Sequence, residues 1–358
     1  MPPAAPVLAL DLGGSRIRAA IVRADGSRHS RVEAATPASG RADVVAACSA
    51  ALRETLGRAT SEGSVQRLDL AGIGISAPGP VDPRTGVVLE PPNLGADFRN
   101  VPLAAEMAAA LGLPAALDRD TNVALLGEAA YGAARGESDA VYITVSTGVG
   151  GAILSGGAIL HGPDGLAGEL GHLAIELDGP RCGCGGIGHV EAIASGTALA
   201  RDAEAAATTG ASPFLQRRAL DGRPLSARDV TAGVDAGDAT CIAILDRAKR
   251  AVAAACVSVA NAYNPHLIVI GGAIALALGE SLLAPVRAVI AADVFPVIGR
   301  RIRVVGPGLG DDISLAGAWP LVHARSPGSP SGVLRHTSNR SRARPHAEPH
   351  AAREVLIP

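Results

Sequence analysis

Two segments of the chain share one pattern, in which a strand, a glycine-rich turn and a second strand follow one another. In the first, the apolar residues 7–11 (VLALD) end in a carboxylate, residues 12–15 (LGGS) form the turn, and a strand resumes over residues 17–22. In the second, residues 141–154 contain the turn STGVGG at 146–151. This repetition predicts two related halves that grip one nucleotide between them.

The chemistry of these turns suits a phosphate group. Glycines let backbone N–H groups approach phosphate oxygens, and the carboxylate of Asp11 can hold Mg²⁺ or its waters. An ordinary glycine turn is the alternative for the first segment. The second turn resembles a dinucleotide fingerprint, but no helix is predicted after it, which argues against a Rossmann fold.

Residues 161–196 concentrate metal-binding and sugar-binding side chains among glycines. They include two carboxylates, two histidines and two cysteines, namely Glu169, Glu191, His172, His189, Cys182 and Cys184. Thiolate and imidazole are ligands that zinc prefers, and structural zinc sites usually have four of them. Carboxylates beside such a site suit sugar hydroxyls, because charge-assisted hydrogen bonds are short and directional. The alternative is a glycine-rich surface loop with two free thiols.

The segment DRDTN at residues 118–122 follows a strand predicted over residues 115–117 and precedes a helix that starts with VALLGEAAYG. A carboxylate at a junction between a strand and a helix is well placed to act as a base. The alternative is that Asp118, Asp120 or Thr121 is only the helix N-cap.

Hydrophobic spacing and turn residues predict the other elements. The glycine pair at residues 271–272 follows a buried strand and can bring the backbone against adenine or ribose, with a simple turn as the alternative. We predict helices over residues 44–56, 101–111, 241–263 and 313–322, strands over 68–76, 267–270 and 302–305, and rigid loops at 77–80 and 91–94.

Composition excludes several classes of protein. A chain of 358 residues is long enough for two domains, and its net charge of −2 argues against a dedicated nucleic-acid binder. An aromatic content of 2% leaves few stacking platforms for single strands. The five cysteines do not resemble a disulfide framework. Neither a signal peptide nor an apolar run long enough to span a membrane is visible, so we expect a cytoplasmic protein without a membrane partner.

The C-terminal residues 325–358 differ in composition from the rest, because they are rich in Ser, Pro, Arg and His. Such a segment cannot bury enough apolar area to offset the entropy of ordering it, so we predict a disordered tail. An arm that binds polyanions is the alternative.

Together, the motifs resemble the ROK family (repressors, open reading frames and sugar kinases) of the actin/hexokinase superfamily, from about residue 7 to 320. The resemblance rests on LALDLGGSRIRAAIV, APGP, PNL, AGELGH and the Cys-x-Cys-Gly-x-x-Gly-x-x-Glu segment, in the family's order. It implies an α/β protein with a two-domain actin-like/hexokinase fold, a duplicated ribonuclease-H-like architecture with a cleft between the domains. Residues 1–118, completed by a C-terminal helix at about 312–324, would form the first domain, and residues 119–311 the larger second domain with a zinc loop.

The resemblance also implies roles for individual residues. Asp120 matches the catalytic base, which takes the proton from the attacking sugar hydroxyl. Positions that match sugar-binding residues are Gly79, Asn93, Arg119, Asp120, Glu169, His172 and Glu191. Positions that match the nucleotide site are Asp11, Gly13, Gly14, Ser15, Thr147, Gly148, Gly271 and Gly272. Positions that match the zinc ligands are His172, Cys182, Cys184 and His189.

Three positions depart from the family pattern. His189 stands where a third cysteine is usual, and imidazole is also a competent zinc ligand. Arg119 stands where an asparagine usually touches the sugar, so the resemblance does not say which sugar fits. Ser15 replaces the commoner threonine and keeps the hydroxyl.

The function implied is an ATP-dependent hexose kinase, glucokinase-like, that phosphorylates the sugar 6-hydroxyl with Mg²⁺ and a structural zinc, as a cytoplasmic homodimer in carbohydrate metabolism. Alternative acceptors are N-acetylated hexosamine, mannose and fructose, and the alternative donor is polyphosphate. A sugar-sensing regulator is a second class, but only six residues precede Val7, which leaves no room for a helix-turn-helix. An inactive sensor would be expected to lack Asp120 or Asp11, and both are present.

Overall fold

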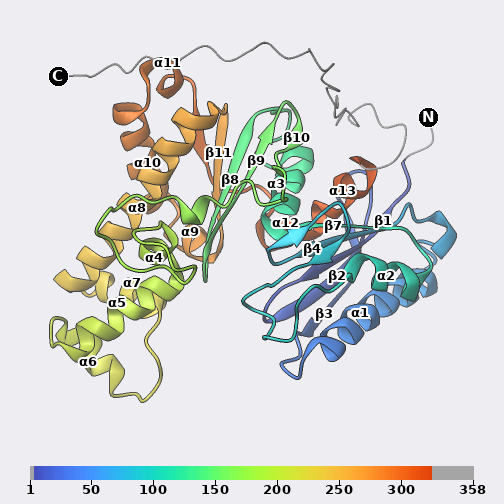
Figure 1. Cartoon of the computed structure of the whole chain (residues 1–358), viewed down its shortest axis with the longest axis horizontal. Helices are drawn as coiled ribbons and strands as arrows, with labels where there is room; N and C mark the ends of the chain where they lie inside the picture. The colour runs from blue at the N-terminus through green and yellow to red at the C-terminus, as the bar shows by residue number, and fades with distance from the viewer. Residues whose placement is uncertain (1–3, 325–358) are drawn as a thin grey trace, which may run out of the picture.

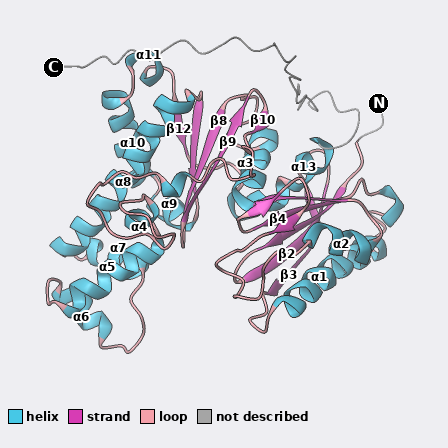
Figure 2. Ribbon diagram, viewed as in Figure 1, coloured by secondary structure: helices cyan, strands magenta, loops and turns pink. Residues whose placement is uncertain are grey.

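The computed structural model describes residues 4–324 and contains two five-stranded sheets. Helices pack against both sheets (Figure 1; Figure 2). The strand order is β3-β2-β1-β4-β7 in the first sheet and β10-β9-β8-β11-β12 in the second. In each sheet the first three strands along the chain pair antiparallel, and the last two join in parallel. The shared order confirms the prediction of two related halves.

The strands of the first sheet come from the N-terminal third of the chain, and helices from that third and from the C-terminal end cover its two faces. The strands are β1 (Val7–Leu12), β2 (Arg16–Val22), β3 (Arg28–Ala35), β4 (Ile73–Ala77) and β7 (Ala115–Arg119). The other elements are α1 (Arg41–Ser61), α2 (Leu103–Leu111), the 3-10 turn η1 (Arg67–Asp69) and the small hairpin of β5 (Val81–Asp82) and β6 (Val87–Val88).

The second sheet is formed by strands from the middle and C-terminal parts of the chain. These are β8 (Ala140–Val145), β9 (Val149–Ser155), β10 (Ala158–Ile159), β11 (Leu267–Gly271) and β12 (Arg303–Val305). The helices and 3-10 turns are α3 (Asp120–Tyr131), η2 (Leu170–His172), α4 (Glu191–Ala194), α5 (Gly196–Thr208), α6 (Pro213–Ala219), α7 (Ala227–Asp235), α8 (Ala239–Tyr263), α9 (Ala273–Leu278), α10 (Glu280–Asp293), α11 (Pro296–Gly299), η3 (Gly310–Asp312), α12 (Ile313–Ala316) and α13 (Ala318–Ala324).

The alternation of side chains along β1 explains how both faces of the first sheet are covered. Leu8 and Leu10 point to the face that packs against α1 and α2, in a cluster with Leu52. Val7 and Ala9 point to the opposite face, which α12 and α13 cover. Because side chains alternate between faces with a period of two, a strand that is apolar throughout must lie between two layers.

The second sheet is covered in the same way. Val141 and Ile143 of β8 belong to the core that contains α5, α8 and α10. Ala140 and Tyr142 face the opposite side, where they pack with Leu125 of α3. The helix α3 therefore follows directly from the edge strand of the first sheet but packs on the second.

The predicted elements agree with the structure, with four corrections. Residues 68–76 do not form one strand: Gln66 N–H donates to the Asp69 carboxylate (2.8 Å), which stabilises the turn η1, and the strand begins at Ile73. None of Asp118, Asp120 and Thr121 is the N-cap of α3, since that position belongs to Arg119 and α3 begins at Asp120.

The other two corrections concern helix ends. The helix expected from residue 101 begins at Leu103, after the N-cap Pro102. The helix expected over residues 313–322 is divided at Gly317 into α12 and α13. Pro320 explains the division, because it has no N–H to donate to the carbonyl four residues earlier.

Within residues 4–324, no helix is both long enough and apolar enough to cross a membrane. The predicted tail at residues 325–358 lies outside the described residues.

Candidate functional site

The predicted base, Asp120, lies where the last strand of the first sheet passes into α3. Its side chain is accessible in a cavity of about 180 Å³, whose wall includes Thr144 of β8 and Asp311 from the segment before α12. The surrounding protein removes water from the carboxylate, and Asp11 and Glu169 add negative charge nearby. Together these effects raise the pKa of Asp120 to about 6. The carboxylate is therefore poised to accept a proton near neutral pH.

The first glycine turn places Asp11 at the end of β1, where three hydrogen bonds hold its side chain. Arg18 donates to Asp11 Oδ2 from Nε (3.0 Å) and Nη2 (2.6 Å), and the Ser76 hydroxyl donates to Oδ1 (2.7 Å). A carboxylate has about four acceptor positions, so one stays available. That arrangement suits a bond to a metal-bound water better than direct coordination by both oxygens.

The second glycine turn joins β8 and β9 and contacts Glu191 at the start of α4. The Glu191 carboxylate accepts a hydrogen bond from the Val149 backbone N–H (3.0 Å). A Cβ atom at Gly148 would lie 2.7 Å from Glu191 Oε2, so a larger residue there would displace this carboxylate. The predicted phosphate turn and a predicted sugar-binding carboxylate are thus in contact.

A second carboxylate, Glu169, is held by Arg119. The guanidinium of Arg119 is buried, and its Nη1 donates to Glu169 Oε1. Gly79, a further predicted sugar contact, packs against the same pair: a Cβ atom there would lie 2.9 Å from Arg119 Cδ and 3.9 Å from Glu169 Oε1. The structure therefore brings three predicted sugar-site residues together, from three separate parts of the chain.

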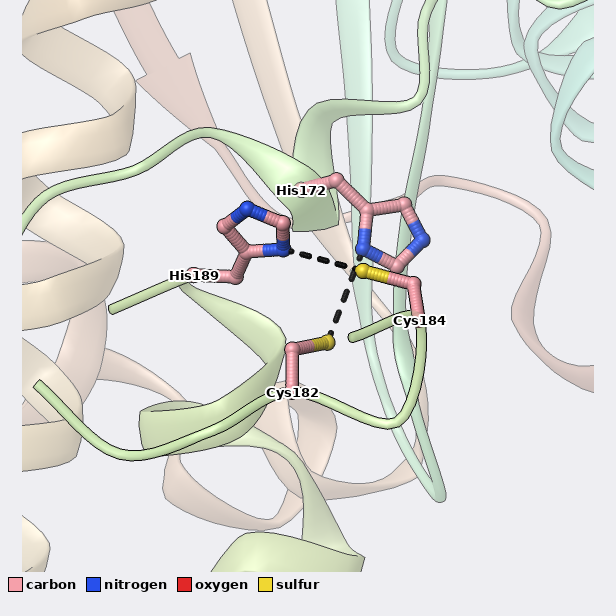
Figure 3. Close-up of side chains that lie close together, drawn as sticks. All are labelled: His172, Cys182, Cys184 and His189. Atoms are coloured by element: carbon pink, nitrogen blue, oxygen red, sulfur yellow. Dashed lines mark hydrogen bonds between the residues drawn. The ribbon is translucent and has the colours of Figure 1, made fainter. Parts of the chain in front are cut away.

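The four predicted zinc ligands form one cluster (Figure 3). The Nδ1 atom of His172 lies 3.7 Å from Cys182 Sγ, and Nδ1 of His189 lies 3.3 Å from Cys184 Sγ. One ligand atom from each residue lies within 4.8 Å of the others. Tetrahedral zinc ligands at about 2.0–2.3 Å from the metal are about 3.3–3.8 Å apart. The two nitrogens and two sulfurs fit a four-coordinate zinc with small side-chain shifts.

A larger cavity, of about 670 Å³, lies beside the second glycine turn. Its wall is mainly apolar and comes from α5, α7 and α9 as well as from Thr147 of the turn. The lining includes Leu199, Ala200, Ala227, Arg228, Ile274 and Leu278. A heteroaromatic ring suits such a cavity, because pockets for cofactors are mostly apolar and contain only a few polar groups.

Three further predicted positions have other contacts. Asn93 is exposed and packs against the first glycine turn, since a Cβ atom at Gly14 would lie 2.9 Å from Asn93 Cβ. Gly272 has φ +91 and lines the smaller cavity beside Asp120. Gly271 instead packs on Tyr142, whose hydroxyl would lie 2.6 Å from a Cβ atom there.

Comparison with known proteins assigns the chain to a family. The model of the ROK family matches residues 7–325. The chain belongs to the ROK family. It is similar to a glucokinase from Thermotoga maritima, with 32% identity over 90% of this chain and 99% of that protein. It is also similar to an N-acetylmannosamine kinase from Shigella flexneri, with 34% identity over 76% of this chain and 84% of that protein.

A solved structure supports the same fold. The chain resembles a ROK family glucokinase from Streptomyces griseus, whose structure is in complex with glucose and AMPPNP, at 30% identity and a TM-score of 0.72. The alignment covers 88% of this chain and 98% of that one. The actin-like fold expected from the motifs is confirmed.

Sequence reasoning missed His161, which is a neighbour of the segment at residues 118–122. The buried carboxylate of Asp118 binds His161 Nε2 (2.7 Å), and this bond lowers the pKa of Asp118.

The apolar cavity was missed because α5 and α7 were not predicted individually. Two signals were available: Ser226 and Asp229 form the capping box that begins α7, and Ser195 caps α5.

Proposed function

We propose that this protein is an ATP-dependent hexose kinase of the glucokinase type, which transfers the γ-phosphoryl group of ATP to the sugar 6-hydroxyl. The observation that supports this most directly is the position of Asp120. Its carboxylate lies where the first sheet passes into α3, in a cavity that Thr144 of the second sheet also lines, and its pKa is raised to about 6. Family membership and similarity to glucokinases agree with this function.

In this proposal the sugar is bound by Glu169, His172 and Glu191, with Gly79, Asn93 and Arg119 around them. Asp120 accepts the proton of the attacking hydroxyl, so that a better nucleophile reaches the phosphorus atom. Phosphoryl transfer asks the protein mainly for positioning and for charge stabilisation. The loop contacts of Glu169 and Glu191 serve the first of these needs.

The nucleotide is proposed to lie along the second sheet. The adenine ring of the adenosine would occupy the cavity of about 670 Å³, and the rest of the adenosine would lie near Gly271 and Gly272. The two glycine turns, with Asp11, Gly13, Gly14, Ser15, Thr147 and Gly148, would surround the phosphates. Mg²⁺ bound with the nucleotide neutralises charge on the phosphate oxygens, and Asp11 would hold one of its waters.

The zinc proposed for this site is structural. Two histidines and two cysteines complete a tetrahedral set and leave no position for a reacting water. The metal would fix the segment between His172 and His189, and with it Glu191, whose Oε1 lies 3.7 Å from Cys182 Sγ. One ring nitrogen of His172 would bind zinc, and the other would stay available for a sugar hydroxyl.

A coupled assay of the purified protein tests the proposed function. Glucose, mannose, fructose and N-acetylmannosamine are offered as acceptors, each with ATP or polyphosphate as donor. We expect the highest kcat/KM for glucose with ATP. N-acetylmannosamine as the best acceptor would support the alternative suggested by the relatives that carry this name. Absence of phosphorylation with every pair would contradict the kinase proposal.

A further inference from the structure

Arg119, one of the three positions where this chain departs from the family pattern, donates four hydrogen bonds through its guanidinium. Nε donates to Thr121 Oγ1 (3.0 Å), Nη2 donates to the carbonyls of Gly151 (2.8 Å) and Ala167 (2.9 Å), and Nη1 donates to the Glu169 carboxylate. Four of the five N–H groups of the guanidinium therefore have protein partners. Because a buried donor without a partner is costly, this set of bonds holds the guanidinium in one place.

These partners lie on elements that are far apart in the chain. Arg119 ends β7, the edge strand of the first sheet, and is adjacent to Asp120. Gly151 belongs to β9 of the second sheet, and Ala167 and Glu169 belong to the loop that precedes η2. The guanidinium thus joins the strand that carries the base to the loop that carries a sugar-binding carboxylate.

The neighbouring backbone leaves room for this side chain. Gly79 and Gly168 border it. A Cβ atom at Gly79 would lie 2.9 Å from Arg119 Cδ, and one at Gly168 would lie 3.1 Å from Arg119 Nη2. Gly168 also has φ +86, a conformation that favours glycine. An asparagine at position 119 is too short to reach Gly151, Ala167 and Glu169 together, and its amide has only two N–H groups.

We infer that Arg119 is a positioning residue that orients Glu169 for the sugar, in place of the direct amide contact usual in the family. This inference rests on the proposed function. Glu169 lies in a loop, and its side chain is 37% exposed, so without a partner it would have to be ordered by each sugar that binds. A carboxylate already fixed by the guanidinium binds with a smaller loss of entropy. Arg119 thereby sets sugar affinity, while Asp120 carries the proton transfer.

The first test is a double-mutant cycle, with glucose affinity measured by calorimetry in the absence of nucleotide. Methionine removes the guanidinium and keeps most of the stem. We expect Arg119→Met to raise the Kd for glucose at least about tenfold in the wild-type background, but less than about threefold in the Glu169→Gln background, because coupled residues are not additive. Steady-state assays should show a larger change in sugar KM than in kcat.

Arg287→Met is the matched control. Arg287 lies on α10, outside the site, and donates to the Val304 carbonyl (2.9 Å) and to Glu280 (2.7 Å), again a carbonyl and a carboxylate. Its Kd for glucose should stay within about twofold of the wild-type value, as expected of an independent site. If Arg119→Met does not fold, Arg119→Lys replaces it in the same cycle, under the same criterion.

The outcomes separate the inference from the proposed function. Equal fold-changes from the Arg119 substitution in both backgrounds, or an unchanged Kd, would overturn the positioning role even if the protein is a kinase. A protein that binds glucose and shows the expected coupling, but phosphorylates no sugar, would support the positioning role and contradict the kinase. A wild-type protein that binds no hexose would overturn both.

Discussion

The carboxylate of Asp120 differs from an ordinary aspartate in its surroundings. It lies in a cavity beside β8, where desolvation by the surrounding protein and the like charges of Asp11 and Glu169 raise its pKa to about 6. Arg119 acts in the opposite direction but does not cancel them. Because a base works only when it is deprotonated, the enzyme should lose activity as the pH falls through this range.

We therefore predict that kcat/KM for glucose is constant above about pH 7 and falls about tenfold per unit below about pH 6. The measurement is a pH profile at saturating ATP, and circular dichroism at each pH is the control for unfolding. An inflection near pH 4 would show that Asp120 ionises like a fully solvated carboxyl group.

Replacing the base tests the same role more directly. Asp120→Asn keeps the shape of the side chain but removes the proton acceptor, so kcat should fall at least about a hundredfold. The Kd for glucose should change little, because the lost interaction forms mainly in the transition state. A folded Asn variant with near-normal turnover would rule out the assignment of Asp120 as the base.

Among the elements, the segment from His172 to His189 has little regular structure to hold it. An isolated bridge between Ala174 and His189 and another between Arg181 and Ile187 are its strand-like pairings among the described residues. Gly188 has φ +67, and a Cβ atom there would lie 1.6 Å from the Glu176 carbonyl oxygen. A four-ligand zinc would supply the rigidity that short bridges do not.

We predict about one zinc per chain, which metal analysis of the purified protein can measure. Cys182→Ser should lose the metal and raise the Kd for glucose, because His172 and Glu191 would no longer be held. Cys256→Ala, in the buried core of α8, is the control and should keep the zinc. Full sugar affinity in metal-free protein would show that the four residues are not a structural metal site.

The helices α5, α7 and α9 enclose the apolar cavity that we assign to adenine. Ala277 lines this cavity and is exposed. Ala277→Phe should fill part of the space and raise the KM for ATP at least about tenfold, while the Kd for glucose stays unchanged. Ala288→Phe, at an exposed position on α10, is the matched control. An unaltered KM for ATP would place the adenine elsewhere.

At the scale of the whole molecule, the proposed site is divided between two sheets. Asp120 follows the first sheet, whereas Glu169 and Glu191 belong to segments around the second. We propose that the chain divides into two domains near residues 118–119, with α12 and α13 returning to the first sheet. A sugar that contacts both sides would draw them together and exclude water from the reaction.

Closure of this kind predicts that glucose lowers the radius of gyration measured by small-angle scattering. A sugar shown by calorimetry not to bind serves as the control. An unchanged radius with saturating glucose would argue for a site that is already closed. The same scattering data would test the homodimer, which stays a prediction, through the molecular mass.

Local patterns in the sequence were sufficient for the repeated strand–turn–strand segments, the site motifs and the helices α1, α2, α3 and α8, but not for α4 to α7 or α9 to α11. The physical reason is that glycine turns, buried strands and metal-ligand residues are defined by neighbours within a few positions. Asp11 and the four metal-ligand residues were singled out from such patterns, whereas the role of Asp120 came from the family resemblance. The structure gathers the four metal-ligand residues into one cluster and gives the two sheets the same strand order.

The partner of Arg119 was decided only by the tertiary structure. A single arginine on a strand end is equally compatible with solvent, a sugar or a carboxylate, because its long side chain reaches many places. Its bond to Glu169 depends on how the edge strand of one sheet meets a loop of the other. The apolar cavity between α5, α7 and α9 has the same origin, since packing between distant segments creates a space that no local pattern records.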